Sequence, residues 1–200
     1  MVTFEMIGGS VCLDFANTGS QRRVGPFVDR LHSYDDLLAW GVQAEQLTEA
    51  EAAQLSSKAA QAPREADAVL ERGRALREAI YRVFTARSRG DILPPDDLLR
   101  ISDEYARATA QRVLAPAGTG MIDFEWRNDD ALDRPLWPVA VSAAVLASSE
   151  EATRVKECAT ENCNWLFLDA SKNRSRRWCE MKECGNRAKA RRHYHRHRTS

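Results

Sequence analysis

The sequence has little of what a membrane protein or a secreted protein needs. No stretch approaches about 18 consecutive apolar residues, so we expect no transmembrane helix and no membrane partner. Residues 1–9 contain neither a basic segment nor a long apolar run, which argues against a secretory signal and predicts a cytoplasmic protein. The apolar fraction of 44% and the charged fraction of 29% are typical of globular proteins.

The recurrent motifs of enzymes are also missing. The chain contains no Gly-rich phosphate loop, no nucleophile elbow and no His-x-x-x-His on an acidic helix. His32 is the only histidine in residues 1–150. We therefore predict that the protein is not an enzyme. General acid–base chemistry by paired carboxylates in the N-terminal region stays open as an alternative.

Charge is balanced over the whole chain but not along it. Residues 1–150 hold 16 Lys+Arg against 23 Asp+Glu, whereas residues 151–200 hold 13 against 6. An acidic body with a basic tail suggests that the tail meets a polyanion. The alternative is that the tail docks on the acidic body of the same molecule.

Residues 1–150 have the pattern of one mainly helical α+β domain. Ser33 resembles an N-cap, and Thr48 begins a capping box. Pro63 and Pro94 suit the first turns of two further helices. The helices expected from these signals and from the spacing of apolar residues cover 34–40, 49–60, 63–87, 94–109 and 139–146, the first of them closed by Gly41.

Two other patterns in this region predict strands. Val11, Leu13 and Phe15 alternate on one side of a strand expected within residues 4–16. Residues 113–126 contain two short β runs around a Gly-containing loop, which is typical of a hairpin. Composition shifts from apolar to basic near residue 150, so we predict a domain of residues 1–150 and a second domain of residues 151–200.

Four of the five cysteines cluster in the second domain. Their pattern is Cys158-x4-Cys163-x15-Cys179-x4-Cys184. Two close pairs joined by a linker are typical of a structural zinc site, because zinc binds four thiolates and stabilises folds too small to have their own core. We predict one structural Zn²⁺ on these four residues; two disulfides and an iron–sulfur cluster are the alternatives. The fifth cysteine, Cys12, lies in an apolar segment and is expected to be a buried small hydrophobe.

The segments around these cysteines predict the rest of a zinc finger. Residues 164–169 form a strand-like run, and residues 176–178 are expected to pair with it. From Gly185 the composition becomes helical, with Cys184 at the expected helix N-terminus. A turn, a hairpin, a second turn and a helix form the arrangement of treble-clef fingers. The predicted fold is therefore a mainly helical α+β domain followed by a treble-clef-like zinc finger with four cysteine ligands.

The finger is strongly basic. Residues 172–198 carry 11 Lys+Arg, opposed only by Glu180 and Glu183. Arginine engages phosphate bidentately and a helix fits the major groove, so DNA is the expected partner. The candidate contacts are Arg174, Arg176, Arg177, Arg187, Lys189, Arg191, Arg192, Arg196 and Arg198. The alternatives are a solvated helix, a helix that binds an acidic protein, and internal bonds from Arg177 and Arg187 to carbonyls or thiolates of the finger.

Several of these residues resemble a known family. Cys184-Gly-Asn-Arg187, preceded by Arg176-Arg-Trp-Cys179, is similar to the CGNR zinc finger. Gly8-Gly9 and Leu13-Asp-Phe-Ala-Asn-Thr18 resemble the opening of the ABATE domain that precedes that finger. The resemblance implies a bacterial, stress-induced transcription regulator that holds zinc on the four cysteines and contacts DNA through the finger.

Asp14 and Asn17 are candidate ligand-binding residues in the N-terminal domain. They follow an apolar segment beside Gly-rich backbone, where they would line the pocket of a sensor domain. The alternative is an Asx-type turn. The leading hypothesis is a DNA-binding regulator whose N-terminal domain senses a small-molecule effector or forms a homodimer. A protein-interaction adaptor with a purely structural finger, and an enzyme with its site in the N-terminal domain, are the alternatives.

Overall fold

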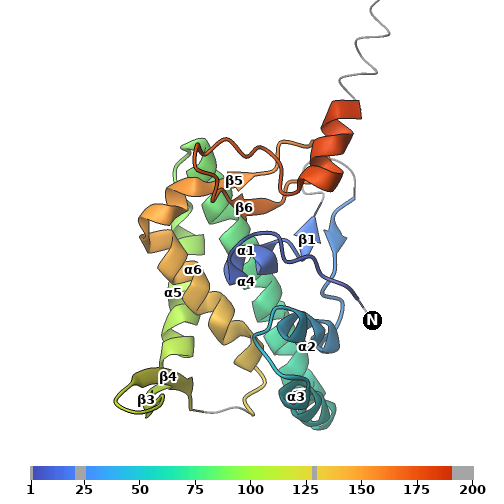
Figure 1. Cartoon of the computed structure of the whole chain (residues 1–200). Coiled ribbons are helices and arrows are strands. Elements are labelled where there is room, and N and C mark those ends of the chain that lie inside the picture. Colours follow the sequence, from blue (N-terminus) through green and yellow to red (C-terminus); the bar gives the residue numbers. More distant parts are fainter. Residues whose placement is uncertain (1, 21–25, 128–129, 191–200) are drawn as a thin grey trace, which may run out of the picture.

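The computed structural model describes residues 2–20, 26–127 and 130–190, and helices dominate this part of the chain (Figure 1). The α-helices with named bounds are α1 (Val11–Ala16), α2 (Tyr34–Gln43), α3 (Glu49–Gln61), α4 (Pro63–Arg89), α5 (Pro95–Thr109) and α6 (Trp137–Ser148). Three antiparallel pairs join β1 (Gly19–Ser20) to β2 (Val28–Asp29), β3 (Arg112–Pro116) to β4 (Ile122–Trp126), and β5 (Val155–Glu157) to β6 (Leu166–Leu168). Shorter helical turns are η1 (Arg134–Leu136), η2 (Glu150–Arg154) and η3 (Met181–Gly185), and residues 186–190 continue η3 as α-helix.

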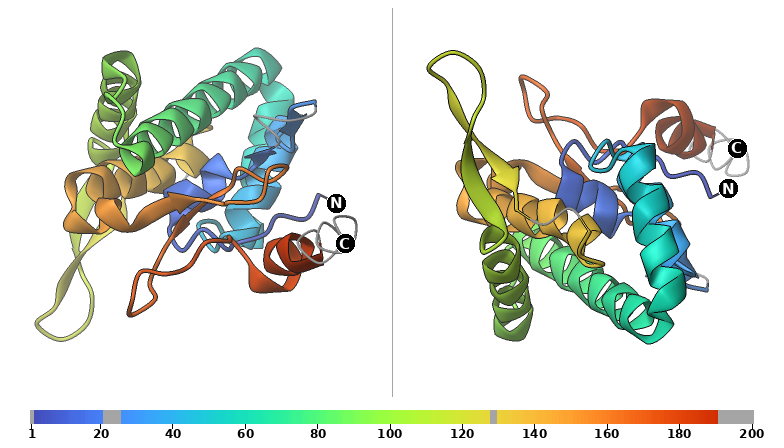
Figure 2. Two further views of the ribbon diagram at one scale, coloured as in Figure 1. Left: turned by 90° about the horizontal axis from the view of Figure 1, so that it is seen from above. Right: turned by 90° about the horizontal axis from the view of Figure 1, so that it is seen from below.

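The long helix α4 organises the body of the molecule. Its buried stripe includes Leu76, Ile80 and Phe84, and it packs against α1, α2 and α5. Helix α6 packs on α5 and α1, so α1 lies inside the helical body (Figures 1 and 2). The long helix α4 ends at Gly90, whose φ of 74° is a left-handed C-cap that favours glycine. A mainly helical body with short hairpins therefore agrees with the predicted fold class.

The predicted helix starts are confirmed at both capping residues. The Ser33 hydroxyl accepts a hydrogen bond from the Asp36 backbone N–H, and the Thr48 hydroxyl accepts one from the Glu51 backbone N–H, both at 3.2 Å. The two acidic side chains bond back to the backbone N–H groups of Ser33 and Thr48. These reciprocal bonds satisfy N–H groups that the first helical turn leaves unpaired.

The strand expected within residues 4–16 is wrong, because α1 occupies Val11–Ala16. The backbone N–H of Asp14 donates to the Ser10 carbonyl at 3.0 Å, which starts the helix. Cys12, Leu13 and Phe15 are all buried, so this short helix is apolar on more than one side. The alternation of apolar residues in this segment therefore did not distinguish a strand from a helix.

Gly41 does not close α2, in contrast to the expectation from sequence. The helix continues through it to Gln43, and Gly41 is buried there. A Cβ atom at Gly41 would lie 2.8 Å from the Leu47 Cδ1 atom, so glycine allows the following loop to return closely onto the helix. The reason for this glycine is close packing rather than helix termination.

The hairpin predicted within residues 113–126 is confirmed. Its register pairs Leu114 with Phe124 and Arg112 with Trp126. Gly118 and Gly120, at φ values of 108° and 75°, provide the left-handed positions of its loop.

The partner predicted for the strand after Cys163 is wrong. β6 pairs with β5, in the register Glu157 to Leu166, and not with residues 176–178. β5 supplies Val155, which is buried with Leu166 in the core of the body, whereas residues 176–178 begin with two arginines. The latter segment makes a backbone–backbone hydrogen bond just after Cys158 instead, from the Ala159 N–H to the Arg177 carbonyl at 3.0 Å.

The hairpin of β5 and β6 lies between two apolar clusters. Leu166 belongs to the core of the helical body, and Leu168 packs against that core. Trp165 and Phe167, which alternate with them, belong to a second cluster around the cysteines. The described helices include none with the length and apolar character needed to cross a membrane.

Candidate metal centre and basic surface

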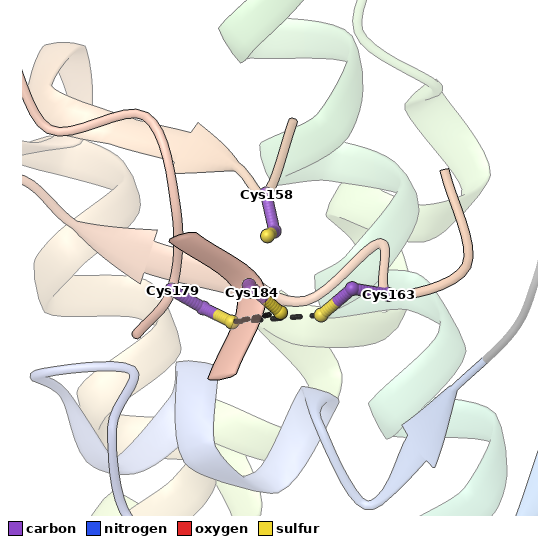
Figure 3. A group of neighbouring side chains, drawn as sticks. All are labelled: Cys158, Cys163, Cys179 and Cys184. Carbon is purple, nitrogen blue, oxygen red and sulfur yellow. Dashed lines mark hydrogen bonds between the residues drawn. The ribbon is translucent and has the colours of Figure 1, made fainter. Parts of the chain in front are cut away.

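The four clustered cysteines come from four separate pieces of the finger. Cys158 follows β5 directly, and its N–H donates to the Trp165 carbonyl at 2.8 Å. Cys163 ends a tight turn in which its N–H donates to the Thr160 carbonyl at 3.1 Å. Cys179 lies in the segment before η3, and Cys184 lies within η3. Figure 3 shows the four sulfur atoms directed toward a common point.

The distances between these sulfur atoms fit one tetrahedral metal ion. All four Sγ atoms lie within 4.8 Å of one another, with 3.5 Å from Cys163 to Cys179 and 3.6 Å from Cys179 to Cys184. Four sulfurs at about 2.3 Å from zinc would be about 3.8 Å apart. A disulfide needs about 2.05 Å between sulfurs, and all five cysteines are free thiols in the structure. The donor set is therefore suited to a soft or borderline metal such as zinc.

An apolar cluster packs on one side of the cysteines. All four cysteines are buried, together with Trp165 and Phe167, while Ile7 of the N-terminal segment packs against them. Asn164, directly after Cys163, has a φ of 62°, a left-handed conformation that asparagine tolerates better than most residues. Hydrogen bonds from the Cys163 and Cys179 thiols hold the pKa of the Cys158 thiol far below its ordinary value.

Cys12 differs from these four in its location and in its chemistry. It is fully buried in α1, and the Ser142 hydroxyl lies 3.1 Å from its backbone nitrogen. Burial raises the pKa of the Cys12 thiol to about 11, despite hydrogen bonds with Ser142 and Ser10. A protonated thiol in an apolar site agrees with the small hydrophobe expected from sequence.

Arg176 is bonded inside the finger. Its guanidinium donates to the carbonyl of Trp178 at 3.0 Å and to the carbonyl of Cys179. The same group lies over the Phe167 ring, with 4.5 Å between the Cζ atom and the ring centroid. Arg176 therefore positions the segment that carries Cys179, a structural role that the sequence analysis did not assign to this arginine.

Lys156 and Asp169 form a second internal network, which sequence reasoning missed. The Lys156 ammonium donates to the Asp169 carboxylate at 2.6 Å and to the carbonyl of Arg176 at 3.3 Å. Asp169 also accepts from the Ser171 N–H at 3.0 Å. Burial alone would raise the pKa of Asp169, but the bonds from Lys156 and Ser171 hold it well below its usual range. The Asp-Ala-Ser order could have indicated an Asx turn, but no local signal identifies Lys156 as its partner.

The structure describes some of the other predicted DNA contacts and not the rest. Arg174, Arg177, Arg187 and Lys189 are exposed on the finger surface. One Arg187 nitrogen lies 3.5 Å from the Cys184 sulfur and 3.6 Å from the Glu183 carboxylate. Arg191, Arg192, Arg196 and Arg198 lie outside the described residues.

Two grooves border this basic surface. One has a volume of about 410 Å³ and is lined by Thr160, Arg177, Trp178 and Arg187, together with Glu161. The other, of about 420 Å³, lies where α4 meets the finger. Arg177 lines both of them.

Asp14 and Asn17 lie on α1 and at its C-terminal end, close to the finger. The Asp14 carboxylate accepts from the Gly8 N–H at 2.7 Å, and its burial raises its pKa to about 6. Asn17 is buried, and its amide makes two bonds of 2.9 Å to the backbone N–H and carbonyl of Leu166. In this structure Asn17 therefore contacts the hairpin of the finger, a long-range contact that local sequence does not reveal.

A helical body joined through a shared hairpin to a four-cysteine finger defines a class of zinc-finger proteins with an N-terminal helical domain. A family model described as "putative stress-induced transcription regulator", the ABATE domain, matches residues 9–150, and the CGNR zinc finger matches residues 154–197. The chain belongs to the ABATE family and carries a CGNR zinc finger, as its sequence motifs indicated. A comparison with curated proteins gave no match.

Proposed function

We propose that this protein is a zinc-dependent transcription regulator that contacts DNA through its finger. The observation that carries the proposal is the groove lined by Arg177 and Arg187, two exposed arginines that line it together with the indole ring of Trp178. Guanidinium forks bind phosphate oxygens bidentately, and their charges displace counterions from a duplex. The family description, which concerns transcription, supports the same function.

The metal in this proposal is one structural zinc ion held by Cys158, Cys163, Cys179 and Cys184. When bound, zinc links the four finger segments by metal–thiolate bonds. Four thiolates fill a tetrahedral coordination shell and leave no position for a substrate. The zinc ion then has a stabilising role and no catalytic one, in keeping with a protein that is not an enzyme.

The N-terminal domain has a sensing or dimerising role in this proposal. The body and the finger share the hairpin of β5 and β6, so a change in the body reaches the finger through packed residues. A small-molecule effector near Asp14 and Asn17, or a homodimer, would act along this route. An adaptor that binds an acidic protein is the second candidate, because the exposed guanidinium groups of Arg177 and Arg187 can also pair with carboxylates.

The test is fluorescence anisotropy of a labelled DNA duplex with the zinc-loaded full-length protein, between about 50 and about 200 mM salt. We expect binding that weakens steeply with salt, and a marked loss of affinity in the double variant Arg177→Ala, Arg187→Ala. Arg64→Ala is the matched control, since Arg64 is exposed near the far end of α4. Absence of binding at the lowest salt concentration would contradict the DNA proposal and favour the adaptor.

A further inference from the structure

Cationic side chains of both the body and the finger line the groove between them. It is lined by Ser88 and Arg89 at the end of α4, by Lys156 and Glu157 of β5, and by Arg176 and Arg177 of the finger. Four of these side chains are cationic and one is anionic. The end of α4 and the strand β5 lie beside each other in Figure 1, in agreement with the ion pair between Arg89 and Glu157.

Arg89 is held in a fixed place at the edge of this groove. One of its nitrogens donates to the Glu157 carboxylate at 2.8 Å, and the other Glu157 oxygen accepts from the Tyr81 hydroxyl at 2.8 Å. The Glu157 side chain is only 7% exposed, whereas that of Arg89 is 45% exposed. A guanidinium has five N–H donors, so this anchored arginine keeps donors for a ligand in the groove.

The groove continues the basic surface of the finger. Arg177 lines it on one side and lines the groove of Arg187 on the other. Arg187, Arg177 and Arg89 thus follow one another from the finger helix to the body. Each strand of a DNA duplex carries about one phosphate per 3.4 Å of helix axis, so it can meet successive cations along such a path.

We propose that the DNA-binding surface extends across this groove to the N-terminal domain, where Arg89 contacts a backbone phosphate. This inference rests on the proposed function and adds a contact from the body to it. Phosphate contacts fix the orientation of a protein on a duplex, while base contacts specify sequence. The body is therefore oriented on the DNA together with the finger, rather than suspended from it.

The experiment compares zinc-loaded full-length variants by DNA anisotropy over the same salt range. Arg89→Ala removes the cation, and Ser88→Glu adds a negative charge beside it while leaving the Arg89–Glu157 pair in place. Each phosphate contact contributes about −0.9 to the slope of log K against log salt. Loss of the Arg89 contact should therefore reduce the fall in affinity across this range about 3.5-fold. Ser88→Glu should weaken binding at the lowest salt concentration.

Arg64→Ala is again the control, because about 38 Å of helix separates Arg64 from Arg89. Thermal melting of each variant shows whether it is folded. If wild type binds DNA but Arg89→Ala and Ser88→Glu match Arg64→Ala, the extension is refuted and the finger proposal stands. If Arg89→Ala weakens binding equally at all salt concentrations, no phosphate contact is lost and the extension is also refuted. If wild type does not bind, the proposed function itself fails.

Discussion

Replacing Asn17 by Ala would remove the two hydrogen bonds that join β6 of the finger to the end of α1. The Asn17 amide oxygen accepts from the Leu166 N–H and its nitrogen donates to the Leu166 carbonyl, each at 2.9 Å. Next along the same strand, the Leu168 N–H donates to the Gly8 carbonyl at 2.7 Å. Asn17 thus pairs with the edge of β6 as a neighbouring strand would.

The expected cost of Asn17→Ala follows from the burial of these groups. Asn17 is 3% exposed and Leu166 is fully buried, so water would not readily replace the lost amide. A buried backbone donor or acceptor left without a partner costs about 1–3 kcal/mol, and here two are affected. We expect a loss of about 2–5 kcal/mol in the free energy of unfolding, a large part of the stability of a typical domain.

The assay is urea unfolding of the zinc-loaded protein, followed by circular dichroism. Asn173→Ala is the control, because Asn173 is an exposed asparagine of the finger whose replacement should change stability by less than about 0.5 kcal/mol. Asn17→Asp adds a sharper comparison, since a carboxylate oxygen would face the Leu166 carbonyl at neutral pH. A loss below about 1 kcal/mol for Asn17→Ala would refute the reasoning, because the hairpin would then not depend on this contact.

Three further predictions follow from the buried groups. Elemental analysis should find one zinc per chain in wild type and in Cys12→Ala but none in Cys158→Ala. A thiol reagent should react with Cys12 only after unfolding, because the Cys12 thiol is buried and its pKa is about 11. The pKa of Asp14 is raised from 3.8 to about 6, so ionisation of Asp14 destabilises the folded state increasingly as the pH rises through that interval. In parallel thermal melts, Asp14→Asn should therefore gain stability relative to wild type between about pH 4 and pH 7. A stability difference that stays constant with pH would contradict this. Arg77→Met should lower the free energy of unfolding in urea by about 3 kcal/mol, because it leaves the Asp29 carboxylate, bonded to Arg77 at 2.5 and 2.9 Å, without its main partner. An unchanged urea midpoint would show that water replaces the ion pair.

Much of the helical body was predictable because its signals are local. The capping residues Ser33 and Thr48 act within a few residues of themselves, and Pro63 begins α4 where its missing N–H costs nothing. The sulfur cluster was predictable for a different reason. Two close pairs of cysteines can bring four thiolates to one metal ion, and the paired spacing in the sequence shows this directly.

The errors and omissions lie where distant segments meet. Helix α1 is buried on more than one side, so its apolar residues showed no helical period. The strand partner was misplaced because β5 precedes Cys158, outside the segment framed by the cysteines. The contact from Asn17 to Leu166 spans 149 positions, and nothing near either residue indicates the other. Packing against a remote surface decides such features, and local pattern does not encode them.

The sequence also overstates the cationic charge of the finger that is free to bind a polyanion. Arg176 uses its donors on two backbone carbonyls, and Lys156, which precedes residues 172–198, is paired with the buried carboxylate of Asp169. A zinc ion with four thiolates carries two excess negative charges, and Arg187 lies 3.5 Å from one of these sulfurs. Arg176 is committed to these carbonyls, so it would release fewer counterions in the proposed binding of DNA. The slope of log K against log salt should therefore correspond to fewer phosphate contacts than the 11 Lys+Arg of residues 172–198.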